Sequence, residues 1–247
     1  MSFHLIKEVR DISRLNQILI VLFEEGFDFL LTGIRLKHKI PITKRLKSKL
    51  SKSEAHKPEV MLRKTLERLG PTFIKFGQVL SVRPDLIPKE YSKELEKLQD
   101  SVPEFSFNEV KLIIEKEFGK SIEHLFLHFE KKPIASASIS QVHKAILKSG
   151  EKVAVKVQRP GVKHIMETDI EIMFYFANLL ERHIEKIRRF KPVKIVNDFK
   201  DWTEKELDFR LEARNAERFY QNFKGSNTVH IPKVYDDLTT ERVLTLE

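Results

Sequence analysis

The stretch Val153-Ala154-Val155-Lys156-Val157 has the pattern of a β-strand with two different faces. Side chains alternate across a strand, so the valines share one face while Ala154 and Lys156 share the other. A small residue beside a lysine leaves room for a flat base and offers a cation to phosphate oxygens. The stretch predicts a nucleotide-binding strand, and a strand with one solvated lysine is the alternative.

The segment before this strand is built almost entirely from small side chains, which let a backbone approach a ligand closely. It contains no glycine, so we expect a stiffer loop than a glycine-rich phosphate loop, which uses positive φ angles. A small-residue turn packed beneath a helix is the alternative. The residues predicted to bind nucleotide are Lys156, Ala154, Ala135, Ser136, Ala137, Ser138, Ile139, Ser140, Gln141 and Val142.

The hydrophobic patterns predict an α+β protein, with helices first and a mixed region afterwards. Helices are expected within 1–40 and 61–125, on either side of a polar, basic linker at 41–60. Turn residues 148–151 predict a hairpin. The rest is expected to form an antiparallel five-stranded sheet with strands at 133–138, 141–147, 152–158, 229–234 and 242–246, and helices at 162–189 and 195–223.

The charge of the chain is concentrated in its first quarter. The formal net charge is +9, and residues 1–64 hold 14 Lys and Arg against 7 Asp and Glu. Such a segment suits anionic lipid, nucleic acid or a solvated surface, and charge alone does not choose among them. The chain has no cysteine, which excludes disulfides, thiolate metal sites and thiol nucleophiles.

The first residues mix charges of both signs and lack the apolar run of a secretory signal. The stretch 18–34 is apolar but contains Glu24, Glu25 and Asp28. Three carboxylates would be costly in lipid, so we expect no membrane-spanning helix here. An amphipathic helix on a membrane surface, or one packed against the rest of the protein, fits better.

A charged helical stretch carries three acidic candidates, Glu206, Asp208 and Glu212. Glu212 could pair with Lys156 and hold it at the height of a bound phosphate. In the alternative interpretation, these acids pair with neighbouring basic residues of the same helix, namely Lys205, Arg210 and Arg214.

An earlier helix contains the sequence Lys75-Phe76-Gly77-Gln78, with Lys75 and Gln78 on one side and a glycine that permits close helix packing.

Together these segments resemble the UbiB/ADCK family of atypical protein-kinase-like proteins, from about residue 60 to 247. The resemblance implies a kinase-like N-lobe whose alanine-rich loop replaces a glycine-rich one and whose Lys156 contacts the phosphates and pairs with Glu212. Ser136 and Ser140 depart from the alanine or glycine of many relatives. Lys75 and Gln78 correspond to a KxGQ signature, expected to face an ExD signature formed by Glu206 and Asp208.

The resemblance also implies three regions: a basic helical region and linker at 1–60, a KxGQ-bearing helical extension at 61–124, and a kinase-like N-lobe at 125–247. A catalytic Asp, an Asn and an Asp-Phe-Gly motif are absent from the sequence. We therefore expect an N-terminal fragment that ends near the inter-lobe hinge, lacks the C-lobe and its catalytic residues, and is inactive by itself.

At the level of the family, the resemblance implies an ATP-binding kinase-like ATPase that supports ubiquinone-type isoprenoid-quinone biosynthesis. It would use ATP or ADP with Mg²⁺, whose ligands lie mostly in the missing lobe. Expected partners are an anionic membrane surface, an isoprenoid lipid or quinone precursor, and quinone-biosynthesis enzymes. The expected location is the cytoplasm, peripherally on a membrane. The alternatives are a non-catalytic pseudokinase scaffold that binds lipid and, less in keeping with the lack of a nucleic-acid motif, a nucleic-acid-binding protein.

Overall fold

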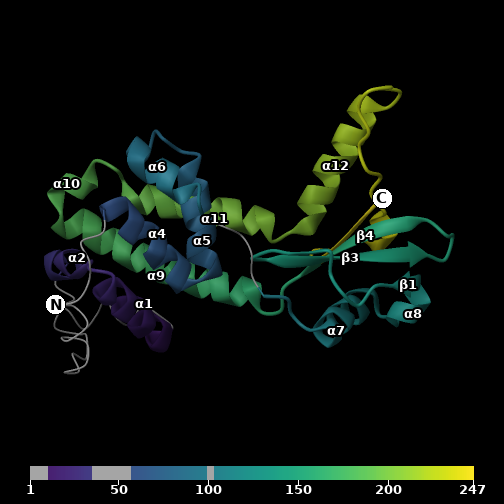
Figure 1. The fold of residues 1–247 in the computed structure, drawn as a ribbon, viewed down its shortest axis with the longest axis horizontal. Coiled ribbons are helices and arrows are strands. Elements are labelled where there is room, and N and C mark those ends of the chain that lie inside the picture. Colours follow the sequence, from purple (N-terminus) through teal and green to yellow (C-terminus); the bar gives the residue numbers. More distant parts are fainter. Residues whose placement is uncertain (1–10, 35–56, 99–102) are drawn as a thin grey trace. The chain divides into compact units, whose positions relative to one another are not determined.

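A computed structural model describes residues 11–34, 57–98 and 103–247, and the fold is α+β as predicted (Figure 1). Residues 41–56 of the predicted linker lie outside the described residues. The helices are α1 (Ile12–Glu24), α2 (Asp28–Gly33), α4 (Pro58–Leu69), α5 (Pro71–Ser81), α6 (Lys89–Leu95), α7 (Phe107–Phe118), α8 (Ile122–Leu125), α9 (Val162–His183), α10 (Glu185–Arg188), α11 (Pro192–Glu206) and α12 (Phe209–Phe223). The strands are β1 (Phe126–Phe129), β2 (Ala135–Ser136), β3 (Ser140–Leu147), β4 (Lys152–Gln158) and β5 (Val243–Leu246), and a 3₁₀ turn covers Asp236–Leu238.

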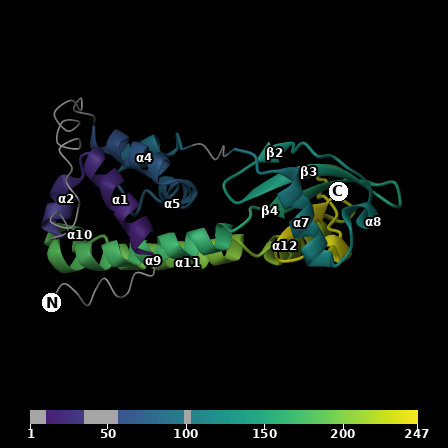
Figure 2. The same ribbon diagram turned by 90° about the horizontal axis from the view of Figure 1, so that it is seen from below.

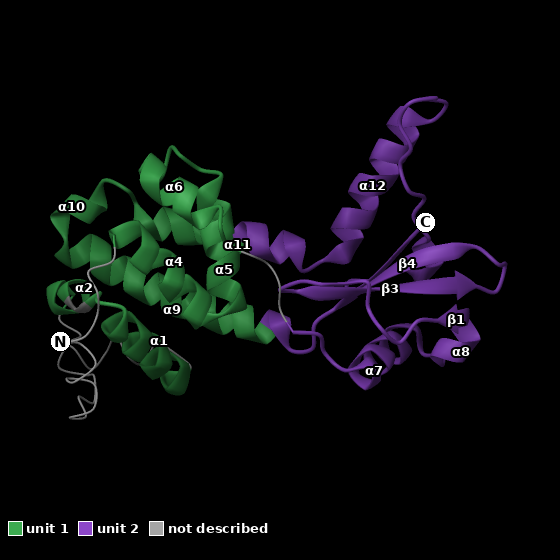
Figure 3. Cartoon of the chain, in the orientation of Figure 1, with its two compact units in different colours: residues 1–100, 164–200 green, residues 101–163, 201–247 purple. Residues whose placement is uncertain are grey.

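The chain divides into two compact units (Figure 3). Unit 1 comprises residues 1–100 and 164–200, and unit 2 comprises residues 101–163 and 201–247. The units follow the packing of the helices, because α7 and α8 bury their apolar side chains against the sheet and most of α9 and α11 packs with the N-terminal helices. The three regions expected from the sequence stay a prediction.

Unit 2 contains the predicted antiparallel five-stranded sheet, with strand order β1-β3-β4-β5 and β2 paired to β3. The hairpin between β3 and β4 turns at the predicted residues 148–151. Its register sets Val142 opposite Lys156 and Lys144 opposite Ala154. Opposed residues share a face of the sheet, so these four side chains lie on the face predicted for the ligand.

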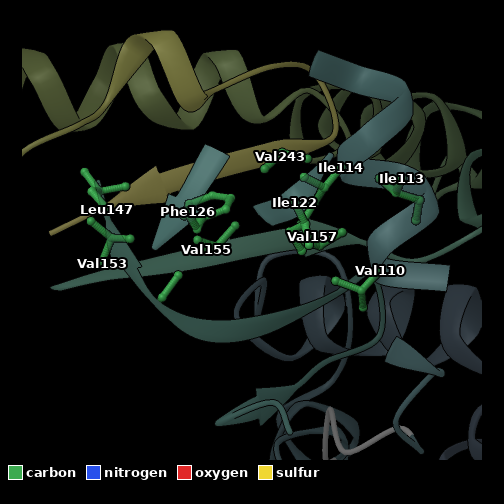
Figure 4. Packing of buried hydrophobic residues seen from close by; sticks show 11 residues of the cluster. Val110, Ile113, Ile114, Ile122, Phe126, Leu147, Val153, Val155, Val157 and Val243 are labelled. Carbon is green, nitrogen blue, oxygen red and sulfur yellow. The ribbon is translucent and has the colours of Figure 1, made fainter. Parts of the chain in front are cut away.

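The other face of the sheet is covered by α7 and α8 around a buried apolar cluster (Figure 4). A capping box between Ser106 and Glu109 starts α7, and Gly119 ends it in the left-handed conformation. This fixes which face of the helix meets the sheet. The cluster comprises Val110, Ile113, Ile114, Ile122, Phe126, Ala145, Leu147, Val153, Val155, Val157 and Val243.

One predicted strand was wrong and one strand was not predicted, although the number of strands was right. The predicted strand at 229–234 contributes only an isolated bridge between Val234 and Leu246. Pro232 within this stretch has no N–H to donate to a ladder, which disfavours a strand. The fifth strand is instead β1, which directly follows the short helix α8.

The helices after the sheet are also shorter than predicted. The predicted helix 162–189 ends at His183, and α10 follows as a separate turn. The predicted helix 195–223 is broken at Leu207 and Asp208 into α11 and α12. Asp208 has an extended backbone and its side chain accepts a hydrogen bond from Arg210 N, so it caps α12 in place of continuing α11.

Unit 1 is a helical assembly in which α9 and α11 run together, with α1, α4 and α5 on one side of them (Figure 2). Gly77 is needed for close packing, because a Cβ there would lie 2.3 Å from Leu98 Cδ1 and 2.8 Å from Leu66 Cδ1. Arg14 joins α1 to α9 by donating through Nε to Asp169 Oδ1 at 2.7 Å, and Asp169 is almost fully buried.

The apolar stretch predicted at 18–34 forms most of α1 and all of α2 and packs within unit 1. Ile18, Leu19, Phe23 and Leu31 are buried in that unit. Among the described residues, no helix has both the length and the apolar character required to cross a bilayer. The burial favours the interpretation that this stretch packs against the protein.

Candidate functional site

Lys156 and Glu212 form an ion pair on the open face of the sheet, with 2.7 Å between Lys156 Nζ and Glu212 Oε2. The pair predicted from the sequence is therefore present. The lysine ammonium also lies 4.7 Å from the centre of the Phe209 ring, within the range of a cation–π contact. The Lys156 side chain is 26% exposed and that of Glu212 is 47% exposed, so a ligand can reach both.

The sheet fixes the position of α12 and hence of Glu212. Gln158 Nε2 donates to Leu207 O at 2.8 Å, and Phe209 N donates to Glu241 O at 3.0 Å. Phe209 is completely buried, which anchors the first turn of the helix. The glutamate that meets Lys156 belongs to this same first turn, so it is held by bonds made at the start of its own helix.

Asp208 behaves differently from Glu212. Its two carboxylate oxygens accept from Arg210 Nε at 2.8 Å and Arg210 Nη2 at 2.9 Å. This hydrogen bonding holds the pKa of Asp208 below its ordinary value of 3.8. For Asp208, the structure therefore shows the alternative interpretation, in which the acid pairs with a neighbouring basic residue. Glu206 is the last residue of α11.

The loop of small residues is pinned to the sheet at several points. β2 pairs with β3 through Ala135 opposite Val142 and Ser136 opposite Gln141. Ala137 N donates to Ser140 O at 2.8 Å, which closes a tight turn. These bonds give a physical basis for the stiffness expected of a loop without glycine.

Arg159 is a residue of this site that the sequence reasoning did not select. Its Nη2 donates to Pro103 O at 3.0 Å, Ala137 O at 3.2 Å and Ser136 Oγ at 3.3 Å. Its backbone N–H donates to Ile139 O at 2.7 Å. Its position directly after the lysine strand was the available signal, since an arginine there can reach back to the preceding loop.

The predicted nucleotide-binding residues divide between the two faces of the sheet. Val142 shares a face with Lys156, whereas Gln141 is opposite Val157 and faces the covered side. Gln141 is buried, its Oε1 accepts from Phe105 N, and its Nε2 donates to Phe105 O at 3.2 Å. A contact from Gln141 to nucleotide would therefore have to use its backbone.

Ser138, Ile139 and Ser140 also have buried side chains. Ala135, Ser136 and Ala137 are more exposed. The part of the loop that is accessible to a ligand is therefore its first half.

Ala154 lies at an open groove of about 390 Å³ on the lysine face of the sheet. Lys144 and Lys152 line the same groove, together with Glu130. The carboxylate of Glu247 also lines the groove, and Lys156 does not, so the predicted place of a flat base beside Ala154 stays a prediction.

Lys75 and Gln78 lie on α5 in unit 1, whereas Glu206 and Asp208 belong to unit 2. Gln78 Nε2 donates to Leu98 O at 3.3 Å, and the intervening Phe76 meets Phe199 edge to face at 5.1 Å. The two signatures are in separately described units, so their predicted approach stays a prediction.

No group of three or more His, Cys, Asp or Glu suited to a metal ion occurs among residues 11–34, 57–98 and 103–247. The described carboxylates of the site are instead engaged by Lys156 and Arg210. These residues do not fit a magnesium site by themselves.

Comparison with known proteins matches residues 97–247 to the ABC1 atypical kinase-like domain. The chain is 43% identical over 186 residues to a "Probable protein kinase UbiB" of Marinobacter nauticus and 46% identical over 186 residues to one of Pseudomonas paraeruginosa. Each match covers 75% of this chain, but only 34% and 35% of the respective relative. The chain thus spans about a third of the length of these relatives.

A solved structure described as the complex of Rv3197 with erythromycin from Mycobacterium tuberculosis is similar in fold and sequence. The TM-score is 0.51 and the identity 31%, over 69% of this chain and 43% of that one. The domain match covers the sheet, the lysine strand and α12. The chain therefore belongs to the ABC1 atypical kinase-like family, which includes the UbiB proteins.

Proposed function

We propose that this chain is the phosphate-binding part of an ATP-binding, kinase-like ATPase that supports isoprenoid-quinone biosynthesis at a membrane surface. The Lys156–Glu212 pair carries the proposal. A glutamate that fixes a strand lysine presents its ammonium to phosphate oxygens in kinase folds. The name UbiB of the relatives supports the link to quinone biosynthesis.

The residues of this chain would bind and orient the nucleotide. Lys156 would neutralise phosphate oxygens, the first half of the loop held by Arg159 would approach the phosphates, and Ala154 would leave room for the base. Mg²⁺ would neutralise phosphate charge when bound. Its ligands would come mostly from other parts of the whole protein, because the described carboxylates of the site are engaged by Lys156 and Arg210.

The experiment is ATP binding and ATP hydrolysis by the full-length protein, with calorimetry and phosphate release as readouts. We expect Lys156→Ala to weaken ATP binding at least tenfold, because the phosphate contact is lost. Lys132→Ala, which changes an exposed lysine of the same unit, is the control and should leave binding unchanged. Unchanged ATP binding in folded Lys156→Ala would contradict the assignment.

The membrane part of the proposal rests on the 14 Lys and Arg among residues 1–64. Flotation with anionic and with neutral phosphatidylcholine vesicles tests it. We expect binding to anionic vesicles only, with loss of binding as salt is raised. Equal flotation with both vesicle types would remove the electrostatic basis of the proposal.

A further inference from the structure

Unit 1 contains an apolar cavity that plays no part in the nucleotide site. Its volume is about 300 Å³, and its lining comes from α1, α2, α4, α5, α9 and α11, all within the same unit. A dry engineered cavity of about 150 Å³ holds one benzene. By that scale this cavity has room for about a dozen carbon atoms, which is most of the hydrocarbon chain of a fatty acid such as palmitate.

The lining is apolar throughout, which sets the chemistry of an occupant. Every described lining residue is a hydrophobic one except Thr65. The Thr65 hydroxyl already donates to Met61 O at 2.8 Å, so it offers no free donor to a ligand. Water would find too few hydrogen-bond partners in such a space, whereas a hydrocarbon chain makes no hydrogen bonds and so gives none up there.

A basic segment lies beside this cavity in the chain. It runs from α10 into the start of α11. The lining residue Leu180 precedes the segment, and the lining residue Pro192 lies within it. Gly33 of α2 packs there, with a Cβ position 3.2 Å from Ile184 Cδ1. We call the following exposed side chains the basic rim: Lys186, Arg188, Arg189, Lys191 and Lys194.

The charges around the basic rim leave it strongly positive. Glu185 is the one acid among residues 185–194, and Glu181 accepts from Val193 N at 3.0 Å. Arg188 Nε donates to Glu181 O at 3.1 Å. Positive groups next to an apolar cavity are complementary to a molecule with an anionic head and a hydrocarbon tail.

We propose that unit 1 binds a single-chain anionic amphiphile, with its hydrocarbon chain in the cavity and its anionic head at the basic rim. The chain's own residues 35–56 are a poorer occupant, because they hold eight Lys and Arg against one Glu and would be repelled by the rim. A fatty acid and an isoprenoid phosphate share the required chemistry.

The experiment measures binding of cis-parinaric acid to the 247-residue chain by fluorescence, with competition by palmitate, geranylgeranyl diphosphate and neutral hexadecanol. We expect saturable binding at micromolar concentration and displacement by at least one anionic competitor. Which of the two anions displaces the probe distinguishes the fatty acid from the isoprenoid phosphate. Lack of saturable binding overturns the proposal.

A pair of matched variants locates the site. Ala177→Phe places a ring in the cavity from a buried position of α9 and should weaken binding at least tenfold. Asn178→Phe changes the next, exposed position of the same helix and should not weaken it. Equal binding by the two folded variants overturns the proposal. If Ala177→Phe does not fold, photo-crosslinking of a diazirine fatty acid must label peptides of the lining helices α1, α2, α4, α5, α9 or α11. Labelling confined to unit 2 overturns the proposal.

Charge reversal tests the basic rim. The double variant Lys186→Glu with Lys194→Glu should weaken the binding of palmitate or of geranylgeranyl diphosphate by about fivefold per lysine. It should leave the binding of hexadecanol unchanged. The control reverses Lys120 and Lys132, exposed lysines of unit 2. Equal effects of the two double variants would overturn the assignment of the head group.

Deletion of residues 35–56 tests the rival occupant. Binding that appears only after this deletion would assign the cavity to the chain's own segment and overturn the proposal. Lys156→Ala should not alter amphiphile binding, so failure of the nucleotide proposal and failure of this one are separable.

Discussion

On strand β4, Val155 and Val157 are completely buried in the cluster with α7, whereas Lys156 between them keeps 26% of its side chain exposed and pairs with Glu212. The valine face of the strand therefore packs in the core of unit 2, and the opposite face carries the candidate ligand-binding lysine. Stability and ligand binding should therefore respond to substitutions at different residues of the same strand.

The polar residues of the two faces differ in the same way. Gln141 and His143 on the covered face are buried, and their hydrogen bonds hold neighbouring backbone. Lys156 and Glu212 on the open face are accessible to solvent. Substitutions on the covered face should affect folding, and those on the open face should affect binding.

The largest effect is expected for Phe126→Ala, which empties part of the covered cluster. Phe126 is 2% exposed, and truncation of a buried phenylalanine destabilises by about 3–5 kcal/mol. Urea unfolding measures the loss. Leu127→Ala, at a neighbour that is 63% exposed, should change stability by less than about 0.5 kcal/mol. Similar losses in the two variants would show that the cluster is not the core of this unit.

Gln141→Ala should have the next largest effect. The change removes the partner of both Phe105 N and Phe105 O, and an unsatisfied buried group costs about 1–3 kcal/mol. Urea unfolding again measures it, with Gln221→Ala as the control, since Gln221 bonds to Glu217 on the exposed side of α12. A loss no larger than that of the control would contradict a role for Gln141 in holding this segment.

His143 should make the covered face sensitive to pH. Burial lowers the pKa of His143 below its ordinary value of 6.5, so the unfolded chain binds a proton more readily than the folded one. The contribution of neutral His143 to the free energy of unfolding should be fully present above about pH 6.5. Below that pH the free energy of unfolding should fall by at most about 1.4 kcal/mol per pH unit. Unfolding between pH 5 and 8 measures the slope.

The control for this slope is a pair of histidine variants. His143→Gln should flatten the dependence on pH, while His124→Gln, at an exposed position, should retain it. A slope that survives in His143→Gln would assign the effect to other groups.

Glu212→Gln should have the smallest effect on stability. The pair with Lys156 is accessible to solvent, and such pairs contribute about 0–1 kcal/mol. ATP binding by the full-length protein should nevertheless weaken, because Lys156 loses the carboxylate that positions it. Glu217→Gln on the same helix is the control. If Glu212→Gln lowered the free energy of unfolding by more than about 2 kcal/mol and left ATP binding unaltered, the pair would stabilise the fold and would not position Lys156 for ATP.

The sequence predicted the features that depend on local alternation and turn residues. The period of two in β4 separated the valine face from the lysine face, and the turn at 148–151 fixed the hairpin. Both are signals contained within a few residues, and they do not depend on the remainder of the fold.

Features that depend on distant partners were not predictable in this way. The break at Leu207 and Asp208 involves Gln158 of strand β4, which donates to Leu207 O. The position of Arg159 directly after the lysine strand was a signal in the sequence, but its contact with Ala137 is set by the fold. The apolar cavity of unit 1 is assembled from six helices, so no single stretch of sequence reports it.

The pairing register of β3 and β4 has a consequence for how genes of this kind can vary in length. Losing or gaining one codon inside β4 would exchange the two faces of the strand. A lysine would then lie in the buried apolar cluster and a valine would lie opposite Glu212. The turn around Gly150 lies outside the ladder and can absorb such a change. Length differences between natural variants should therefore gather at residues 148–151 and spare the strand that carries Lys156.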